Sequence, residues 1–596
     1  MPERQPVRSE GKSRVVKYTV SDLIIHTLKS AGVRRVYGIP GDSLNGFTDA
    51  LFRDGTISWQ HVRHEEAAAF AAAGEAAITG EVAVCAASCG PGNLHLVNGL
   101  YDAHRSRVPV VAIAAHIPTK EIGGFYFQET HPQELFRECS AYCELVTSAA
   151  QLPAVLDIAV RSAVEQKDVS VLVVPGDVLL TSIERPAAIT TIRPSRSVVR
   201  PSESELGSAA DALNAAHKVT ILAGTGCAGA RAEVFALAEA LQAPIVHSLR
   251  GKEFIEYDNP YDVGMTGLLG FSSGYHAMEE CNLLLMLGTD FPYREFYPEG
   301  VTVIQVDLRG EHIGRRTRVD VPLIGTVRDT AAALLPRLKP KSDRRHLERM
   351  REHYAKTRAD LDKLAVSDHN RTPVHPQFVA RTVDEVADAD AVFLADVGTP
   401  VVWAARYLRT NGKRRLIGSF THGSMANSLP QALVVQASQP GRQVITFSGD
   451  GGLAMMFGEL ITLGQLKLPV KIVVFNNGAL SFVELEMKAA GLVNFGTDLE
   501  DPNFSAVASA LGLHGQRVER PNDLASALRT AFDFDGPALV EVMTARQELS
   551  LPPTITREQV RNFTLYATRT VLSGRGDELI DLAKTNIEPH ILTGGV

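Results

Sequence analysis

Two stretches, 443-QVITFSGDGG-452 and 470-VKIVVFNNGAL-480, decide how this chain folds. Each starts as a continuous apolar run and ends in glycine and polar residues, and the segment between them, 453–468, has the composition of a helix. The order strand, helix, strand predicts a βαβ unit with two parallel strands. Asp450 and Asn477 then stand 477 − 450 = 27 residues apart, at the carboxyl ends of the two strands. We therefore expect their side chains to meet above neighbouring strands.

Similar apolar runs occur in three groups along the chain, and polar segments rich in Pro, Ser or charge separate the groups at 194–205 and 339–345. The runs are 34–41, 81–88, 108–115 and 169–174 in the first group, 219–224, 243–247, 282–288 and 301–307 in the second, and 391–398, 443–450, 470–477 and 538–543 in the third. Such runs, alternating with helices, indicate parallel sheets buried on both faces. The predicted fold class is α/β, with three successive open, mostly parallel domains and a C-terminal amphipathic helical tail. Ligands are expected beyond the carboxyl ends of the strands.

The composition excludes some classes of partner. The 596 residues are 45% hydrophobic, and 60 basic against 68 acidic residues leave a formal net charge of −8, so no nucleic acid partner is expected. The chain has no apolar stretch of about 18 or more residues, so we expect no membrane-spanning helix. The six cysteines are too few for a disulfide framework and fit small buried residues in a reducing cytoplasm.

The glycines around Asp450 suit a phosphate group. Gly449, Gly451 and Gly452 allow close approach of the backbone to a diphosphate, and the following helix start offers free N–H groups. A carboxylate, an amide oxygen and a backbone carbonyl form the hard oxygen site that Mg²⁺ prefers. A capped turn and an ordinary Asn-Asn-Gly turn would also explain these residues taken singly.

The GDG-to-NN pattern resembles the diphosphate and metal signature of thiamine-diphosphate enzymes. This resemblance implies that Asp450, Asn477 and the carbonyl of Ala479 hold Mg²⁺. The segment 418-GSFTHGSMANSLPQ-431 resembles the stretch that supports the bent cofactor, with Met425 at the supporting position. The implied contacts of thiamine diphosphate are Glu65, Gly423, Ser424, Met425, Asp450, Gly451, Gly452, Asn477, Gly478, Ala479, Leu480, Ser481, Phe482 and Val483.

A second part of the site is expected in 62-VRHEEAAAFAAAGEA-76, which resembles the N-terminal domain of the same family. The resemblance implies that the carboxyl group of Glu65 contacts the aminopyrimidine ring and exchanges a proton with it. By composition alone, the same residues are a helix start with favourable acidic side chains, and Met425 is a filler of the core.

The middle of the chain resembles the FAD-binding domain of pyruvate oxidases, through 247–278 and 288-GTDFPYREFYP-298, although 224-GTGCAGA-230 only approximates a dinucleotide fingerprint. The implied FAD contacts are Thr266, Gly267, Leu268, Leu269, Thr289, Asp290, Phe291, Pro292, Tyr293 and Asp307. Asp307 could equally be a helix cap.

The segments 125-FYFQETHP-132 and 478-GALSFVELEMK-488 resemble the substrate pocket of the same family. The implied catalytic residues are Glu65, Phe127, Gln128, Phe482, Val483 and Glu486. Gly478 and Ala479 depart from the pair that usually follows the two asparagines, which bears on the flexibility of the loop rather than on the carbonyl ligand.

The tail 557–586 carries apolar residues at helical spacing, namely Val560, Phe563, Ala567 and Val571 with Leu565 and Leu572 beside them, and then Leu579, Ile580, Leu582 and Ala583. Docking on the same subunit explains this pattern as well as membrane binding does. Five basic against four acidic residues from Arg557 to Lys584 leave lipid binding to the apolar face.

The tail also resembles that of quinone-dependent pyruvate dehydrogenases, and the resemblance runs from about Tyr18 to Asn586. It implies oxidative decarboxylation of pyruvate to acetate and CO₂, with electrons passing through FAD to a membrane quinone. It further implies a cytoplasmic homotetramer, peripheral on the inner face of the cell membrane through its tail. The expected domains are a mobile basic arm (1–17), a pyrimidine-binding domain (18–193), a central FAD-binding domain (194–338), a linker region (339–375), a diphosphate-binding domain (376–548) and the tail (549–596).

Other functions stay open. An acetolactate synthase-type carboligase shares both cofactor motifs, and an oxygen-dependent pyruvate oxidase differs only in its electron acceptor. A nicotinamide dehydrogenase would need the dinucleotide fingerprint that the chain lacks. A binding protein without catalysis would not need Glu65, Asp450 and Asn477 together.

Overall fold

The computed structural model describes residues 17–186, 188, 192, 197–366, 372–500, 502–546, 548, 557–572, 578, 579, 582, 585 and 586. The chain divides into two compact units, residues 1–195 and 196–596, and each is described by itself. The expected basic arm lies outside the described residues except for Lys17, and so do 549–556, Ile580, Ala583 and 587–596.

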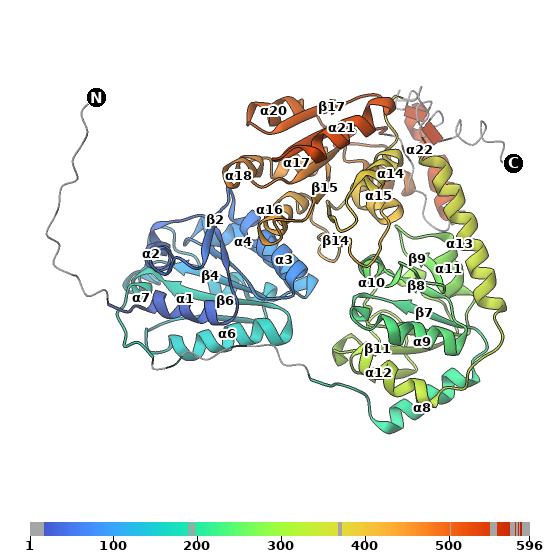
Figure 1. Cartoon of the computed structure of the whole chain (residues 1–596), viewed down its shortest axis with the longest axis horizontal. Coiled ribbons are helices and arrows are strands. Elements are labelled where there is room, and N and C mark those ends of the chain that lie inside the picture. Colours follow the sequence, from blue (N-terminus) through green and yellow to red (C-terminus); the bar gives the residue numbers. More distant parts are fainter. Residues whose placement is uncertain are drawn as a thin grey trace. The chain divides into compact units, whose positions relative to one another are not determined.

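The first unit is built on a six-stranded parallel sheet with the strand order β2-β1-β3-β4-β6-β5 (Figure 1). Its central strands β3, β4 and β6 are buried along their whole length. The strands are β1 (Arg35–Gly38), β2 (Ser58–His61), β3 (Ala83–Ala87), β4 (Val110–His116), β5 (Tyr142–Leu145) and β6 (Val169–Pro175). The helices are α1 (Val20–Ser30), α2 (Asn45–Asp54), α3 (Glu65–Thr79), α4 (Pro91–Ser106), α5 (Pro132–Leu135), α6 (Leu152–Gln166) and α7 (Gly176–Leu179).

The second unit contains two further six-stranded parallel sheets, and the first of them has the order β12-β11-β10-β7-β8-β9. Its strands are β7 (Val219–Ala223), β8 (Ile245–His247), β9 (Asp262–Met265), β10 (Leu283–Leu287), β11 (Thr302–Asp307) and β12 (Val321–Ile324). The helices are α8 (Glu203–Ala215), α9 (Arg231–Leu241), α10 (Lys252–Ile255), α11 (Ser272–Glu279) and α12 (Val327–Leu334). The expected linker region holds a long helix, α13 (Arg345–Leu364), which packs on α11 and β9.

The third sheet has the order β14-β13-β15-β16-β18-β17. Its strands are β13 (Val392–Ala395), β14 (Arg415–Ile417), β15 (Val444–Gly449), β16 (Lys471–Asn476), β17 (His514–Val518) and β18 (Ala538–Met543). The helices are α14 (Pro376–Val386), α15 (Thr399–Tyr407), α16 (Ser428–Ser438), α17 (Asp450–Met455), α18 (Glu459–Leu466), α19 (Ser481–Ala489), α20 (Phe504–Ala510) and α21 (Pro521–Asp533). The predicted α/β fold class with three parallel sheets is therefore confirmed.

The two sheets of the second unit are joined by polar contacts as well as by apolar packing. Arg415, on β14, forms a two-pronged ion pair with Glu253 of α10, at 2.7 and 3.2 Å. Nε of the buried Arg406, on α15, donates a hydrogen bond of 3.1 Å to the carbonyl oxygen of Leu269. These bonds tie α10 and the segment after β9 to the third sheet.

The tail forms one further helix, α22 (Arg557–Leu572), which packs against α19. The ring of Tyr566 is fully buried, and Nη1 of Arg569 donates a hydrogen bond of 2.6 Å to the carbonyl oxygen of Gly491. Val571 and Leu572 are exposed. Of the two arrangements expected for the tail, the described helix adopts the docked one.

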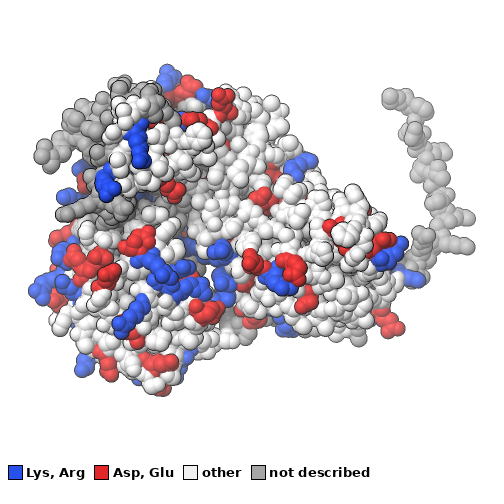
Figure 2. Space-filling view, turned by 180° about the vertical axis from the view of Figure 1, so that it is seen from behind, with Lys and Arg blue, Asp and Glu red and all other residues white. Residues whose placement is uncertain are grey.

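The charged side chains on the surface are distributed as the composition suggests. Figure 2 shows acidic and basic side chains intermingled on the face that it draws, as the near balance of charges predicts. No helix among the described residues is long and apolar enough to cross a membrane. All six cysteines are free thiols, and every one except the half-buried Cys143 is buried, as predicted.

Candidate active site

The carboxylate of Asp450 is the centre of the predicted diphosphate site. It follows β15 directly, begins α17 and is only 3% exposed. One of its oxygens accepts hydrogen bonds from the backbone N–H groups of Asn477 (2.9 Å) and Gly478 (2.7 Å), and the other accepts from Gly451 (2.8 Å). Burial raises the pKa of Asp450, and these backbone bonds act in the opposite direction. The side chain therefore ties the end of β15 to the end of the neighbouring strand β16.

The two asparagines after β16 have different environments. Nδ2 of the buried Asn476 donates to Glu541, a buried residue of β18, at 2.9 Å. Oδ1 of the half-buried Asn477 accepts from the N–H of Ala479 at 3.1 Å, beside Asp450. The carbonyl of Ala479, the third predicted metal ligand, accepts from the N–H of Ser481 at 2.9 Å and keeps a second lone pair. The structure thus places two of the predicted metal ligands in one turn and holds the third, Asp450, against that turn by hydrogen bonds.

Gly451 shows how closely other segments approach this turn. A Cβ atom added at Gly451 would lie 3.1 Å from Leu499, 3.2 Å from Leu480 and 3.4 Å from the terminal methyl group of Met425. Met425, predicted to support the cofactor, is therefore a neighbour of the Gly-Asp-Gly turn, although it precedes Asp450 by 450 − 425 = 25 residues in the chain. The three side chains line an apolar wall next to a polar turn.

The loop that carries Met425 is held by local hydrogen bonds. The N–H of Ser424 donates to Oγ of Ser419 at 3.1 Å, and the side chain of Asn427 joins the N–H of Ser419 to the carbonyl of Ser424. Gly423 has a φ of +87° and Ala426 a φ of +62°, and the second value is a strained conformation for a residue with a Cβ atom. Several hydrogen bonds hold the loop in this strained conformation, which is typical of a segment that presents a side chain to a ligand.

Asp396 belongs to this site and was missed in the sequence. It follows β13, the neighbour of β15 on the side away from β16, so three adjacent strands end in Asp396, Asp450 and Asn477. Its Oδ1 accepts from the N–H of Ser428 at 2.9 Å, and its Oδ2 has no hydrogen-bond partner among the described residues. Burial raises the pKa of Asp396 to about 6. An aspartate closing the apolar run 391–395 was the signal that could have revealed it.

The helix α19 follows the turn and carries the predicted substrate residues. Phe482 is half-buried, whereas Val483 and Glu486 are exposed. Glu484, which the sequence did not single out, is buried and forms ion pairs with Arg546 and with Lys488 at 3.7 Å, as well as a 2.9 Å hydrogen bond from Thr497. This network anchors the buried side of α19 and leaves its other side free for a ligand.

The predicted FAD residues lie at the carboxyl ends of β9, β10 and β11 in the second unit. Thr266 to Leu269 follow β9, Thr289 to Tyr293 follow β10, and Asp307 ends β11. A Cβ atom at Gly267 would lie 2.7 Å from the ring of Phe291, so the first two segments touch. Oγ1 of Thr266 is buried and has no hydrogen-bond partner among the described residues. Because buried hydroxyl groups nearly always have a hydrogen-bond partner, a buried hydroxyl without one fits a segment that binds a ligand.

Two of the predicted FAD residues are also held by other groups of the protein, Asp290 by side chains and Asp307 by a backbone N–H. Asp290 pairs with Arg316 at 2.7 Å and with Arg315 at 3.2 Å, and Asp307 accepts from the N–H of Arg309 at 2.9 Å. Burial, followed by the charges of Glu295 and Glu486, raises the pKa of Tyr293. Since Glu486 lies on α19, the charge of the predicted substrate helix acts on the segment after β10.

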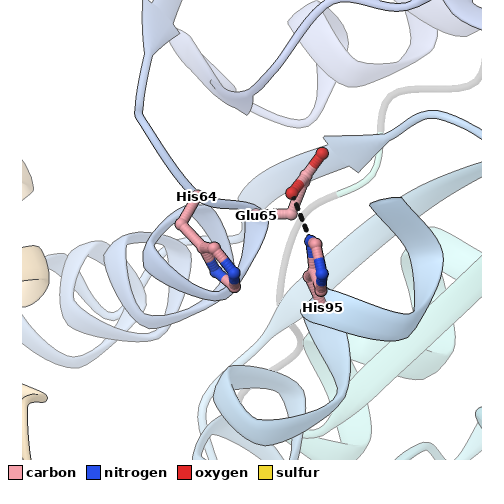
Figure 3. A group of neighbouring side chains, drawn as sticks. All are labelled: His64, Glu65 and His95. Atoms are coloured by element: carbon pink, nitrogen blue, oxygen red, sulfur yellow. Dashed lines mark hydrogen bonds and ion pairs between the residues drawn. The ribbon is translucent and has the colours of Figure 1, made fainter. Parts of the chain in front are cut away.

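Glu65, in the first unit, begins α3 and is 9% exposed (Figure 3). His64 caps the helix, because its Nδ1 accepts from the N–H of Glu66 at 3.2 Å. The carboxylate of Glu65 lies 2.9 Å from Nδ1 of His95, on α4, and a Cβ atom at Gly92 would lie 3.1 Å from its other oxygen. His95 is a partner of Glu65 that the sequence did not reveal.

Phe127 and Gln128 lie in the same unit. Oε1 of Gln128 accepts from the thiol of Cys89 at 3.4 Å, and a Cβ atom at Gly90 would lie 2.8 Å from Gln128. The turn before α4 therefore touches Gln128 at one end and Glu65 at the other. Phe127 is 78% exposed.

Three parallel α/β sheets, an aspartate and an asparagine joined after a Gly-Asp-Gly turn, and a glutamate at a helix start in a separate unit form the organisation of a thiamine-diphosphate-dependent enzyme. Models of the three domains of such enzymes match the chain, as the N-terminal TPP binding domain at 18–138, the central domain at 206–334 and the C-terminal TPP binding domain at 396–542. The chain belongs to the thiamine pyrophosphate enzyme family.

Curated relatives cover almost the whole chain. It is 36% identical, over 95% of its length and 98% of the relative's, to YdaP of Bacillus subtilis (strain 168), provisionally described as a thiamine pyrophosphate-containing protein. It is 32% identical, over 87% of its length and 94% of the relative's, to the large subunit of acetolactate synthase isozyme 2 of Escherichia coli (strain K12). It is 29% identical, over 85% of both lengths, to pyruvate oxidase of Lactiplantibacillus plantarum. These identities do not separate the two reactions.

Proposed function

We propose that this enzyme oxidatively decarboxylates pyruvate to acetate and CO₂, with thiamine diphosphate, Mg²⁺ and FAD as cofactors and a membrane quinone as electron acceptor. It would act as a homotetramer in the cytoplasm, attached to the inner face of the membrane through its tail. Membership of the thiamine pyrophosphate family supports the first cofactor. Mg²⁺ and FAD rest on the contacts described above, and the quinone, the homotetramer and the attachment to the membrane rest on the resemblance of the sequence.

The chemistry of the donors around Asp450 supports Mg²⁺. The buried carboxylate, the amide oxygen of Asn477 and the carbonyl of Ala479 are all hard oxygen donors, and nitrogen or sulfur donors are absent from this set. Gly451 and Gly452 place no side chain at the start of α17, where backbone N–H groups can bind a diphosphate. When bound, thiamine diphosphate supplies an electron sink for decarboxylation. Glu65 would hold a proton at its carboxylate, and His95 would orient that carboxylate through the 2.9 Å contact.

The segments after β9 and β10 support a flavin. They touch each other through Gly267 and Phe291, and the buried hydroxyl of Thr266 offers a donor and an acceptor to a ligand. Thr289 and Phe291 are buried, and Tyr293 gives this region an exposed aromatic edge. These residues would hold FAD, which accepts two electrons when bound.

The single observation that carries the oxidative function is the position of α19. The helix starts directly after the turn that joins Asp450 and Asn477, the charge of its Glu486 raises the pKa of Tyr293 in the flavin segment, and α22 packs against it. A reaction that passes electrons from thiamine diphosphate to flavin needs the two sites close together in space. A tail that attaches to the membrane in response to substrate binding needs contact with the substrate helix, α19.

A reductive half-reaction tests the proposal. Pyruvate is added anaerobically to the full chain loaded with thiamine diphosphate, Mg²⁺ and FAD, and the flavin absorbance is followed. We expect bleaching, release of acetate and reoxidation by a soluble quinone. The same assay with vesicles of anionic lipid, on the full chain and on a chain ending at Leu551, tests the tail, because only the full chain should respond to lipid.

A second candidate is an acetolactate synthase-type carboligase, which the 32% identity to an acetolactate synthase favours. That enzyme would leave the flavin oxidised while acetolactate accumulates, and this result would reject the oxidative function. Rapid reoxidation by air, with no response to quinone, would instead identify an oxygen-dependent pyruvate oxidase.

A further inference from the structure

Three side chains that ligate metals converge at the start of α3. His64 and Glu65 come from this start and His95 from the neighbouring helix α4, as Figure 3 shows. One ligand atom of each of the three lies within 4.8 Å of the ligand atoms of the other two. Among the described residues, this is the one such group of three or more His, Cys, Asp and Glu side chains.

The distances are close to those of a metal site. Two ligands of a tetrahedral first-row ion lie roughly 3.3 Å apart when each is about 2.0 Å from the metal. Oε2 of Glu65 and Nδ1 of His95 already lie 2.9 Å apart, so this pair needs little movement. The imidazole rings of His64 and His95 are stacked with their centroids 4.3 Å apart and must turn until their nitrogens converge.

The exposure of the ligands permits this movement. The side chains of His64 and His95 are 40% and 44% exposed, so both rings can reorient and an ion can enter from solvent. The side chain of Glu65 is 11% exposed and provides the fixed ligand. Glu66, whose carboxylate lies 3.9 Å from His64, adds a second negative charge close to the entering cation.

We propose that His64, Glu65 and His95 form a binding site for a transition-metal ion, with Zn²⁺ as the expected occupant. Two imidazoles and one carboxylate are the ligands of many zinc sites, which leave a fourth position to water. Imidazole favours Zn²⁺, Cu²⁺ and Co²⁺ over Mg²⁺, so this site differs in selectivity from the oxygen site at Asp450. The ion replaces the proton shared between Glu65 and His95.

This site would make the enzyme sensitive to zinc, an effect that rests on the proposed role of Glu65. A carboxylate bound to Zn²⁺ is not available to thiamine diphosphate, so the ion and the cofactor compete. The site itself rests only on the three side chains.

Titration of the full chain with Co²⁺, before thiamine diphosphate is added, tests the site. Co²⁺ stands in for Zn²⁺ and gives a visible absorption band when it is bound by four ligands. The variants are H64N and H95N, and asparagine at position 64 retains an oxygen that can cap α3. H61N, on the adjacent strand β2, is the matched control.

We expect both ligand variants to weaken Co²⁺ binding by about tenfold or more, while H61N binds as the unchanged chain does. D450N should also bind Co²⁺ normally, because it alters only the oxygen site. The absence of a Co²⁺ band would overturn the proposal, and so would H64N and H95N variants that unfold normally and bind Co²⁺ as tightly as the unchanged chain.

A competition experiment separates this inference from the proposed function. Saturation with thiamine diphosphate and Mg²⁺ should weaken Co²⁺ binding if Glu65 serves both ligands. Co²⁺ binding that depends on both histidines and ignores thiamine diphosphate would support the metal site and contradict the assigned role of Glu65.

Discussion

At the scale of single residues, the site depends on carboxylates that the fold keeps away from water. Asp450 accepts three backbone hydrogen bonds, and Asp396 has one oxygen without a partner among the described residues. The sequence revealed Asp450, because a Gly-Asp-Gly turn and two asparagines follow successive strands. It did not reveal Glu484, because the importance of this residue lies in contacts with residues distant in the chain, and Asp396 offered only its place after the apolar run 391–395.

Asp450→Asn should weaken the binding of thiamine diphosphate with Mg²⁺ by about 10–100-fold or more, since it removes a charged metal ligand. The new amide would also direct N–H atoms toward the backbone donors of Asn477 or Gly451, which lowers stability by about 1–3 kcal/mol. Calorimetric titration measures the first effect and thermal unfolding the second. D523N, at a half-exposed position of α21, is the control, and equal affinities for both variants would contradict the prediction.

Gly452→Ala should disturb the same site through sterics alone. The added Cβ atom would lie 2.5 Å from Oδ2 of Asp396, and we expect a loss of about 1–3 kcal/mol together with weaker binding of thiamine diphosphate. Gly441→Ala, where nothing lies within 4 Å of the new atom, is the matched control and should change the thermal midpoint little. Identical midpoints for the two variants would show that the contact is not restrictive.

At the scale of elements, the sequence predicted the centre of each sheet better than its edges. All twelve apolar runs are strands, and the six strands that were not predicted, β2, β5, β9, β12, β14 and β17, are the two edges of each sheet. Edge strands are covered on fewer sides, so their apolar runs are short or interrupted. The buried edge strand β9 was missed for a different reason, because Asp262 and Gly264 break its apolar pattern.

The docking of α22 on α19 also depends on a glycine. A Cβ atom at Gly491 would lie 2.9 Å from the carbonyl oxygen of Asn562, on α22. Gly491→Ala should therefore loosen α22, and limited proteolysis should cut the tail about 5–30-fold faster if the contact is worth about 1–2 kcal/mol.

Gly496→Ala is the matched control for α22. Gly496 has a φ of +70°, close to the +74° of Gly491, but an added Cβ atom there would meet nothing within 4 Å. Both variants carry the same conformational cost, so their difference measures the contact with α22. Equal rates of cleavage would mean that Gly491 does not hold the tail.

At the scale of the whole molecule, a buried polar cluster in the middle domain should make stability depend on pH. Asp262 faces His247, Glu256, Lys252 and Tyr354, and burial raises its pKa from 3.8 to about 8. Burial also lowers the pKa of His247 to about 4, so this histidine is neutral near pH 7.

Asp262→Asn should raise the thermal midpoint at alkaline pH. Between about pH 4 and pH 8 the folded chain keeps a proton on Asp262 that the unfolded chain has lost, so the free energy of unfolding falls as pH rises. Below about pH 4 both states are protonated and the effect of the variant should vanish. Midpoints measured from pH 4 to pH 9 check this, and a constant difference across that range would contradict it.

The predicted site is divided along the chain, with Glu65 and Asp450 far apart and the predicted flavin residues between them, and this division stays a prediction. What the sequence lacked was the pairing of side chains from different elements. His95 and Arg546 bind Glu65 and Glu484 across separations of 30 and 62 residues, and no local pattern marks such partners.

The docked helix α22 has one more consequence, which concerns competition. A segment tethered to its own binding surface is present there at an effective concentration on the order of millimolar, whatever the concentration of the protein. A lipid bilayer, a detergent micelle or another protein can bind α22 only if its affinity for the helix exceeds that of the intramolecular contact with α19. The strength of the α19–α22 contact thus sets the threshold of any outside signal that the tail can sense.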